Sequence, residues 1–332
     1  MTRRRRRGEE TADDGRLVIY PREVDIDVGH LFDPDAYEAP SAQPAEDDFG
    51  AIADAVREER SLVPGPDGRP ARVIHLHSLD KAYYVRFYAD IVAKAMKQRW
   101  RDQIAWVELY SGPGTLWVKE QKTFMDGSPL EALGIKKPYG IYAFADLDPR
   151  CVEALDARIA EKHPDLRNDV HIFQGDANSP ELHDQLVSVL PKNALIVLYA
   201  DPAELNFHFE TIKFFADRYE HLDLLLNFPA AGVVRALAAG HDAKAASVLG
   251  HAEPLALIGP TSARTNVSLS QFFEGKLRGL GYEHFASEPI KNSKNSAIYD
   301  LMIASRDPRA KDFFEKALAR SRAGQYRMTG LF

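Results

Sequence analysis

The chain has 332 residues, of which 45% are hydrophobic, 10% aromatic and 27% charged, and its formal net charge is −7. This composition is typical of a globular protein and excludes a collagen-like, fibrous or wholly disordered chain. The net negative charge argues against a surface that binds nucleic acid over its whole extent.

The sequence has no feature typical of a membrane protein or a disulfide-bonded protein. Its single cysteine, Cys151, cannot form an internal disulfide and cannot by itself hold zinc or an iron–sulfur cluster. No apolar run reaches the length of about 18 residues that a membrane-spanning helix needs. The basic residues at the start have no apolar stretch behind them, which argues against a secretory signal. We therefore expect a cytoplasmic protein with no membrane attachment.

The first 70 residues mix acidic residues, prolines and glycines with few aromatic residues. We predict a disordered tail over 1–15 and a partly ordered extension over 16–70. The tail contains an arginine run, 3–7, that could contact phosphates, although blocks of like charge are more often solvated.

Beyond residue 71 the pattern predicts alternating helices and strands. Residues 81–100 carry apolar side chains at i, i+3, i+4 and i+7, which indicates an amphipathic helix. Five short, almost wholly apolar runs then alternate with helical stretches, at 104–110, 141–145, 170–174, 195–200 and 222–227. Such runs are typical of strands buried on both faces, and their alternation with helices predicts a parallel sheet.

The end of the chain breaks this alternation. A predicted helix near 269–280 is followed by two strand-like runs, 282–290 and 297–305, separated by the turn-forming residues 291–296. Because so short a connection can join only antiparallel strands, we expect a terminal hairpin. This predicts an α/β, Rossmann-like class I methyltransferase fold, a mainly parallel seven-stranded sheet with a C-terminal antiparallel hairpin, over 71–320, followed by a tail over 321–332.

Two glycines, Gly112 and Gly114, directly follow the first buried strand. They allow a tight turn and the close approach of a ligand. Glu108, inside that strand, could hold the ammonium group of a bound amino acid or accept hydrogen bonds from loop amides. A loop over 115–124, which could act as a lid, separates the turn from a helix that we expect Ser128 to cap. This departs from the GxGxxG pattern and argues against a pyrophosphate site.

Acidic residues also follow the next three strands. Asp146 is placed to accept the ribose hydroxyls of an adenosine, and Asp176, with Ala177, to bind its adenine. Asp201 would lie beside the group that is transferred. Each acid could instead cap a helix or turn, but ligands of open α/β sheets bind at the carboxyl ends of the strands. Four acids gathered there, including Glu108, therefore favour a ligand site.

Further candidates are weaker. Pro202 and Asn227 could line the substrate cleft, and His75 and His77 are expected at the surface. No GxSxG, HExxH, P-loop or CxxC motif occurs, so common hydrolase, kinase and zinc chemistry have no support and no metal is expected.

Five motifs in this order resemble the three-Cys-motif partner (TcmP) family, which is described as methyltransferase-like. They are VELYSGPGT (107–115), GSPLEAL (127–133), ADLDP (145–149), GDAN (175–178) and the Asp-Pro pair at 201–202. The similarity covers roughly 75–320. It implies S-adenosylmethionine as cofactor and a partner protein with a three-cysteine motif, which this chain lacks.

The chain departs from the family pattern at two places. Glu108 stands where the family usually has Asp, and Ala203 and Glu204 follow Pro202 where the family more often shows Phe-Gly. Amino-methyltransferases that act on nucleobases typically carry a second proline and an aromatic residue there, so the sequence argues against base methylation.

Three hypotheses follow. In the first, the protein is an S-adenosylmethionine-dependent methyltransferase that acts on nucleic acid or a nucleotide-like molecule, with Asp201 aligning the acceptor and catalysis resting mainly on proximity. In the second, it is a non-catalytic cofactor-binding or scaffold module for the three-Cys partner. The third, a nicotinamide enzyme, is disfavoured by the displaced glycine turn and the hairpin. The sequence does not identify the acceptor or the oligomeric state.

Overall fold

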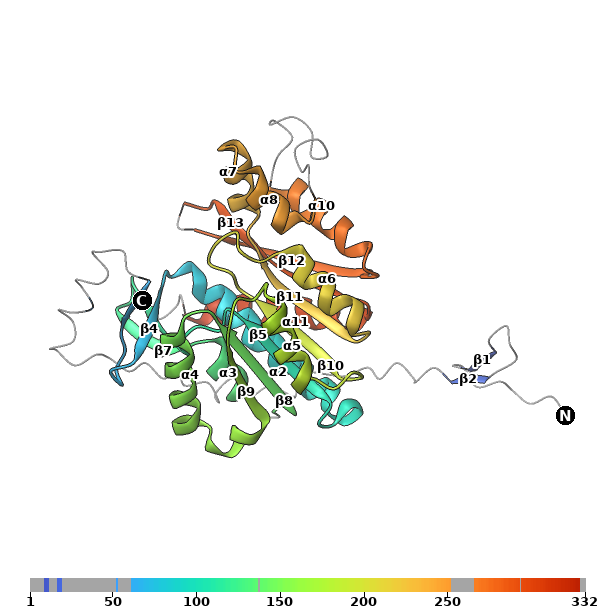
Figure 1. The fold of residues 1–332 in the computed structure, drawn as a ribbon, viewed down its shortest axis with the longest axis horizontal. Helices are drawn as coiled ribbons and strands as arrows, with labels where there is room; N and C mark the ends of the chain where they lie inside the picture. The colour runs from blue at the N-terminus through green and yellow to red at the C-terminus, as the bar shows by residue number, and fades with distance from the viewer. Residues whose placement is uncertain are drawn as a thin grey trace. The chain divides into compact units, whose positions relative to one another are not determined.

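The computed structural model describes residues 9–11, 17–19, 52, 61–136, 138–251, 266–292 and 294–328 (Figure 1). The chain forms two units. Unit Met1–Glu38 contains the antiparallel pair β1 (Glu9–Thr11) and β2 (Leu17–Ile19), and unit Ala39–Phe332 contains the other elements. The arginine run 3–7 lies outside the described residues, whereas β1 falls within the tail predicted to be disordered.

A seven-stranded sheet forms the centre of the larger unit. Its order is β12-β13-β11-β10-β5-β8-β9, and only β13 runs antiparallel to the others. The strands are β5 (Ile104–Leu109), β8 (Ile141–Asp146), β9 (Val170–Gln174), β10 (Leu195–Ala200), β11 (Leu222–Phe228), β12 (His284–Lys291) and β13 (Ala297–Ser305). This topology confirms the predicted Rossmann-like class I methyltransferase fold.

Helices cover both faces of this sheet (Figure 1). One face packs against α5 (Pro180–Val189), α6 (Phe209–Arg218), α7 (Ala230–Ala238), α8 (Asp242–Leu249) and α10 (Asn266–Arg278). The other packs against α2 (His77–Trp100), α3 (Ser128–Leu133), α4 (Pro149–Lys162) and α11 (Pro308–Met328), while a 3₁₀ helix, η3 (Pro164–Asp169), leads into β9. Strand residues point alternately to the two faces, so β5 places Val107 in one hydrophobic cluster and Trp106 in the other.

A second, four-stranded sheet corrects the predicted loop over 115–124. It has the order β3-β4-β6-β7, with strands β3 (Leu62–Pro64), β4 (Pro70–Ile74), β6 (Thr115–Val118) and β7 (Thr123–Asp126). The segment after the glycine turn is therefore a paired hairpin and not a free lid. Its Trp117 and Phe124 rings pack with centroids 4.7 Å apart, which buries both side chains.

Both predicted domain boundaries cut through elements of the structure. Position 71 falls inside β4, and β3 from the predicted extension pairs with β4 because its Val63 is buried with Ala71 and Trp117. At the other end, α11 continues to Met328, beyond the boundary at 320. Among the described residues, no helix is long and apolar enough to cross a membrane.

Candidate ligand site at the carboxyl ends of the strands

Strand register brings the predicted site residues to one edge of the sheet. Ala200, the last residue of β10, pairs with Leu109 of β5 on one side and Leu226 of β11 on the other. Leu109 in turn pairs with Ala145 of β8. The residues that immediately follow these positions therefore lie along the same edge, as the parallel arrangement predicted.

The turn after β5 has an unusual backbone. Tyr110, Gly112 and Gly114 have φ angles of 67°, 65° and 81°, a left-handed region that glycine adopts at low cost and tyrosine does not. A Cβ on Gly114 would lie 2.8 Å from Leu155, so this glycine allows the turn to pack on α4. A Cβ on Gly112 would meet only Arg72, at 3.9 Å, so the space beside Gly112 is open.

Asp146 ties the end of β8 to this turn. Its Oδ2 accepts a hydrogen bond from the Gly112 N–H (2.8 Å), and its Oδ1 accepts one from the Asp148 N–H (2.9 Å). Next to this buried carboxylate, Leu147 has an exposed fraction of 66%. The sequence analysis missed Leu147, because a leucine after an apolar strand carries no signal of exposure.

Glu108 is enclosed by protein groups. It is 1% exposed, and it accepts hydrogen bonds from the Ser128 hydroxyl and, at 3.3 Å, from the Trp106 indole N–H. Burial raises the pKa of Glu108 to about 8, although both hydrogen bonds oppose the shift. The prediction that Ser128 caps α3 is wrong: Gly127 is the N-cap, and the Ser128 side chain binds Glu108 instead.

The loop after β9 is held by a network of its own. The Asp176 carboxylate accepts hydrogen bonds from the Asn178 backbone (2.9 Å) and side-chain amide (3.1 Å), which is the turn-cap alternative left open above. The Asn178 amide also donates to the Asn206 carbonyl (2.6 Å) in the loop after β10. Ala177 is buried, and its carbonyl contacts His183 Nε2 at 2.9 Å. The Asp176 side chain is nevertheless exposed, so a ligand can reach it.

The fourth acid, Asp201, is engaged on both oxygens. Oδ2 forms an ion pair with the Lys81 ammonium group, and Oδ1 accepts a hydrogen bond from the Asn227 side chain at 2.7 Å. The Lys81 side chain is only 13% exposed. Burial acts to lower the pKa of Lys81, but Asp201, with smaller contributions from Tyr299 and Glu108, more than offsets this, so the pKa lies above its ordinary value.

Lys81 was not among the predicted site residues, although its spacing gave a signal. It lies three, four and seven residues before Tyr84, Val85 and Tyr88, on the same buried stripe of α2. A lysine on such a stripe needs a partner for its charge. The sequence alone could not show that the partner is Asp201, 120 residues away.

The two predicted substrate-binding residues lie together at a small cavity. Pro202 and Asn227 line a cavity of about 10 Å³ with Phe207 and Phe273, which is too small for an organic substrate. The Asn227 Oδ1 is buried, and no described group donates a hydrogen bond to it.

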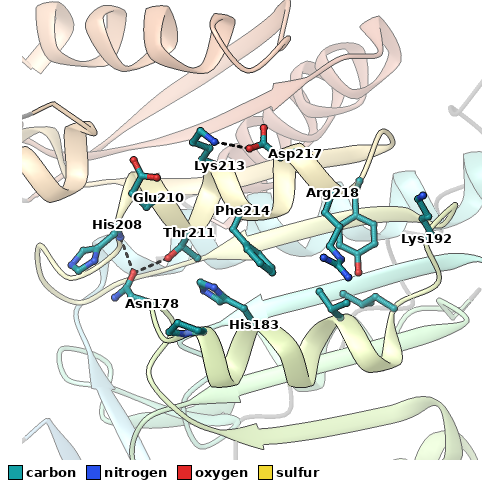
Figure 2. A pocket seen from close by; sticks show the side chains of 14 residues that line it. Asn178, His183, Lys192, His208, Glu210, Thr211, Lys213, Phe214, Asp217 and Arg218 are labelled. Carbon is teal, nitrogen blue, oxygen red and sulfur yellow. Dashed lines mark hydrogen bonds and ion pairs between the residues drawn. The ribbon is translucent and has the colours of Figure 1, made fainter.

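A larger groove lies away from this edge, between α5 and α6. Figure 2 shows His183 and Phe214 facing one another within it, with ring centroids 4.7 Å apart, and its volume is about 970 Å³. Asn178 lines one end, where its Oδ1 accepts a hydrogen bond from the His208 N–H (2.9 Å). None of the predicted site residues lines this groove, so it is not the site formed by the strand-end acids.

The two histidines of the extended stretch stack on each other at the surface. The His75 and His77 ring centroids are 5.5 Å apart, and His75 Nδ1 lies 2.8 Å from Glu120. His75 is exposed, as predicted. Within the described ranges, no group of three or more His, Cys, Asp or Glu side chains could hold a metal ion.

Comparison with known proteins gave matches among solved structures alone. No family model matches the chain. No curated protein sequence matches it either.

Three of the similar structures are methyltransferases. An O-methyltransferase from Bacillus cereus in complex with SAH has 10% identity and a TM-score of 0.40, covering 67% of this chain and 80% of its own. The O-methyltransferase TomG from Streptomyces achromogenes in complex with SAM has 11% identity and a TM-score of 0.41, with coverages of 79% and 90%. The METTL16 methyltransferase domain has 11% identity and a TM-score of 0.42, with coverages of 90% and 86%. The fold assignment rests on the strand order and directions of this chain itself.

Proposed function

We propose that the protein is an S-adenosylmethionine-dependent methyltransferase. One observation carries the proposal. At the carboxyl edge of a sheet with the class I methyltransferase topology, Asp146 accepts a hydrogen bond from Gly112 in the glycine turn. Two glycines give this turn its left-handed backbone, and open space lies beside Gly112. Solved structures with bound SAM or SAH are among the similar ones, which is consistent with this cofactor.

The residues at this edge fit such a cofactor. The Ser111 hydroxyl in the turn is buried, and none of the described groups forms a hydrogen bond with it, so a polar ligand atom could satisfy it. Asp146 would accept the ribose hydroxyls, and Asp176, with Ala177, would contact the adenine. The exposed Leu147 would supply an apolar surface for the base.

The remaining groups fit the amino-acid end. Glu108 lies inside the strand that leads into the turn, and it would hold the methionine ammonium group by giving up the hydrogen bond that it now accepts from Ser128. When bound, S-adenosylmethionine supplies an electrophilic methyl group on a positively charged sulfur. Asp201 and Asn227 would position the acceptor, and alignment of the two reactants would provide most of the rate acceleration.

The partner in this proposal rests on the sequence resemblance, and the acceptor class is that of the first hypothesis from the sequence. Within this proposal the acceptor is nucleic acid or a nucleotide-like molecule, and the protein acts beside a three-Cys-motif protein. Incubation of the protein with labelled S-adenosylmethionine and candidate nucleic acids, with and without that partner, tests both points. Transfer of label only to molecules that are neither nucleic acid nor nucleotide-like would overturn the acceptor class.

A scaffold function is the second candidate, and one observation favours it. Both Asp201 oxygens already bind protein groups, Lys81 and Asn227, so no carboxylate oxygen at this position is free of a protein partner. Isothermal titration calorimetry with S-adenosylmethionine separates the possibilities. Micromolar binding, about 7–8 kcal/mol, is expected of a cofactor site. Binding without turnover on any acceptor would favour the scaffold, and absence of binding would overturn the methyltransferase proposal.

A further inference from the structure

Lys81 introduces a positive charge into a site otherwise made of strand ends. It comes from the first turns of α2, while its partner Asp201 directly follows β10. Ala200 at the end of β10 pairs with Leu109 at the end of β5, so Asp201 and Tyr110, where the glycine turn begins, are the next residues after the two strands at this edge. The ion pair therefore lies at the point where the turn and the acceptor side of the site meet.

The groups that surround Lys81 leave Asp201 as its main charged partner. Burial raises the pKa of Tyr199 and of Tyr299, whose ring centroid lies 5.2 Å from the Lys81 ammonium, so both hydroxyls are neutral near neutral pH. Burial lowers the pKa of His77, one turn before Lys81, and raises that of Glu108 to about 8. Lys81 therefore balances the Asp201 carboxylate almost alone.

We propose that Lys81 sets how strongly the site prefers the positively charged cofactor over its neutral product. By neutralising Asp201, Lys81 keeps the site from binding the sulfonium form much more tightly than the demethylated form. The inference rests on the proposed function. S-adenosylmethionine and S-adenosylhomocysteine differ by a methyl group and one positive charge on sulfur. An unpaired carboxylate near that sulfur would stabilise the bound sulfonium before transfer, which lowers the dissociation constant without helping the chemical step. The Lys81 ammonium group removes this bias.

A double-mutant cycle on dissociation constants tests the proposal without any acceptor. Calorimetry gives the affinities of S-adenosylmethionine and S-adenosylhomocysteine for wild type, Lys81→Met, Asp201→Asn and the double variant. Lys81→Met should shift the ratio towards S-adenosylmethionine by roughly 3- to 30-fold, the range Coulomb's law gives for a unit charge about 6 Å away in a partly solvated cleft. Asp201→Asn, which leaves Lys81 unpaired, should shift it the opposite way, and the double variant should return close to the wild-type ratio.

The same helix offers a matched control. Lys94 forms a comparably buried ion pair with Asp90 (2.6 Å), so Lys94→Met removes the same charge at a similar structural cost and should leave the ratio unchanged. If Lys81→Met does not fold, as judged by circular dichroism, the shift in Asp201→Asn still decides the question.

The outcomes distinguish the two proposals. Normal binding of both ligands with an unchanged ratio in Lys81→Met and Asp201→Asn would overturn this inference and leave the proposed function standing. Equal shifts for Lys94→Met and Lys81→Met would also overturn it, because the effect would then be structural. Absence of binding to wild type would overturn the proposed function and this inference together.

Discussion

At the scale of single residues, Asp146 fixes the turn after β5 and, in the proposed function, would also hold the ribose. Both of its oxygens hold backbone N–H groups, and a ribose would compete for the same oxygens. Asp146→Ala should weaken S-adenosylhomocysteine binding by about 1.5–3 kcal/mol, the range for a lost charged hydrogen bond. Calorimetry measures this loss, and wild-type affinity in the variant would show that the ribose assignment is wrong.

Asp148 gives the matched control for that experiment. It lies two residues further on and caps α4 by accepting a hydrogen bond from the Arg150 N–H. Asp148→Ala should cost about 1 kcal/mol of stability, as loss of a helix cap does, and should leave the affinity unchanged. A similar affinity loss in both variants would point to a general disturbance of the loop.

Glu108 predicts a dependence of stability on pH. Its pKa is raised from 4.5 to about 8 in the folded protein, so between these values the native state binds more protons than the unfolded state. The free energy of unfolding should therefore fall as the pH rises through this window. One titrating group can change the free energy of unfolding by at most about 1.4 kcal/mol per pH unit in this window. Glu108→Gln should remove the contribution of Glu108 to this pH dependence.

Urea unfolding between pH 5 and pH 8 measures that slope. Part of it should remain in Glu108→Gln, because burial also raises the pKa of Asp223 to about 7. Asp223→Asn should remove the contribution of Asp223 to the pH dependence of stability, mainly below pH 7. An unchanged slope in Glu108→Gln would show that the carboxyl group is ionised in the folded protein throughout this range.

The residues of the site divide by how far their roles could be predicted. Asp146 and Glu108 could be proposed from the sequence because an acid at or inside a buried strand stands out against apolar neighbours. The bond between Ser128 and Glu108 was missed, because serine before proline fits a helix cap equally well. The pairing of Lys81 with Asp201 depends on how α2 packs on the sheet, which no local pattern contains.

At the scale of elements, one buried side chain connects the two sheets. Arg158 of α4 is 2% exposed. It binds both Asp67 oxygens (2.7 and 2.8 Å) beside β4, and it donates to the Pro113 carbonyl (2.6 Å) in the glycine turn. Arg158 thus anchors the smaller sheet to the proposed cofactor site.

Removal of that guanidinium group should be costly. Arg158→Met leaves Asp67 and several carbonyls without their donor, so we expect a loss of about 2–4 kcal/mol in the free energy of unfolding, less than for a fully buried pair because Asp67 is partly exposed. Urea denaturation measures it. Arg167→Met, which removes a surface pair with Asp156 in which both side chains are about half exposed, is the control and should cost less than about 1 kcal/mol.

The same ion pair has a defined pH range. Arg158 and Arg69 outweigh the effect of burial and lower the pKa of Asp67 from 3.8 to about 2. Its contribution to stability is therefore complete above about pH 4 and is lost as the pH falls through 2. The destabilisation of Arg158→Met relative to wild type should shrink in this acidic range, and a constant difference down to pH 2 would contradict the assignment.

Elements were predicted well where burial on both faces made the pattern strong. The five parallel strands match the predicted apolar runs to within one residue at each end, because a strand covered by helices on both sides must be apolar throughout. The hairpin of β6 and β7 was missed because its strands have four residues each and are separated by charged residues. Its pairing depends on β4, which lies far away in the sequence.

At the scale of the whole molecule, the division of the chain into two units predicts the effect of truncation. Residues Met1–Glu38 and Ala39–Phe332 form separate compact units. In the smaller unit, β1 and β2 pair with each other, and a two-stranded pair is at best marginally stable alone. The sequence motifs predicted to bind the cofactor all lie beyond this part of the chain.

Removal of residues 1–15 should therefore leave the melting temperature and the affinity for S-adenosylhomocysteine nearly unchanged. This deletion removes β1 and the arginine run and no described member of the three clusters. Deletion of residues 1–64 is the contrasting variant. It also removes β3, whose Val63 is buried against Trp117 in the four-stranded sheet. Arg158 joins this sheet to the glycine turn. We expect that loss to lower the melting temperature by several degrees, since a buried valine and a paired strand together contribute roughly 2–3 kcal/mol. Differential scanning calorimetry compares the two. A drop of several degrees on removal of 1–15 alone would show that this segment packs on the larger unit.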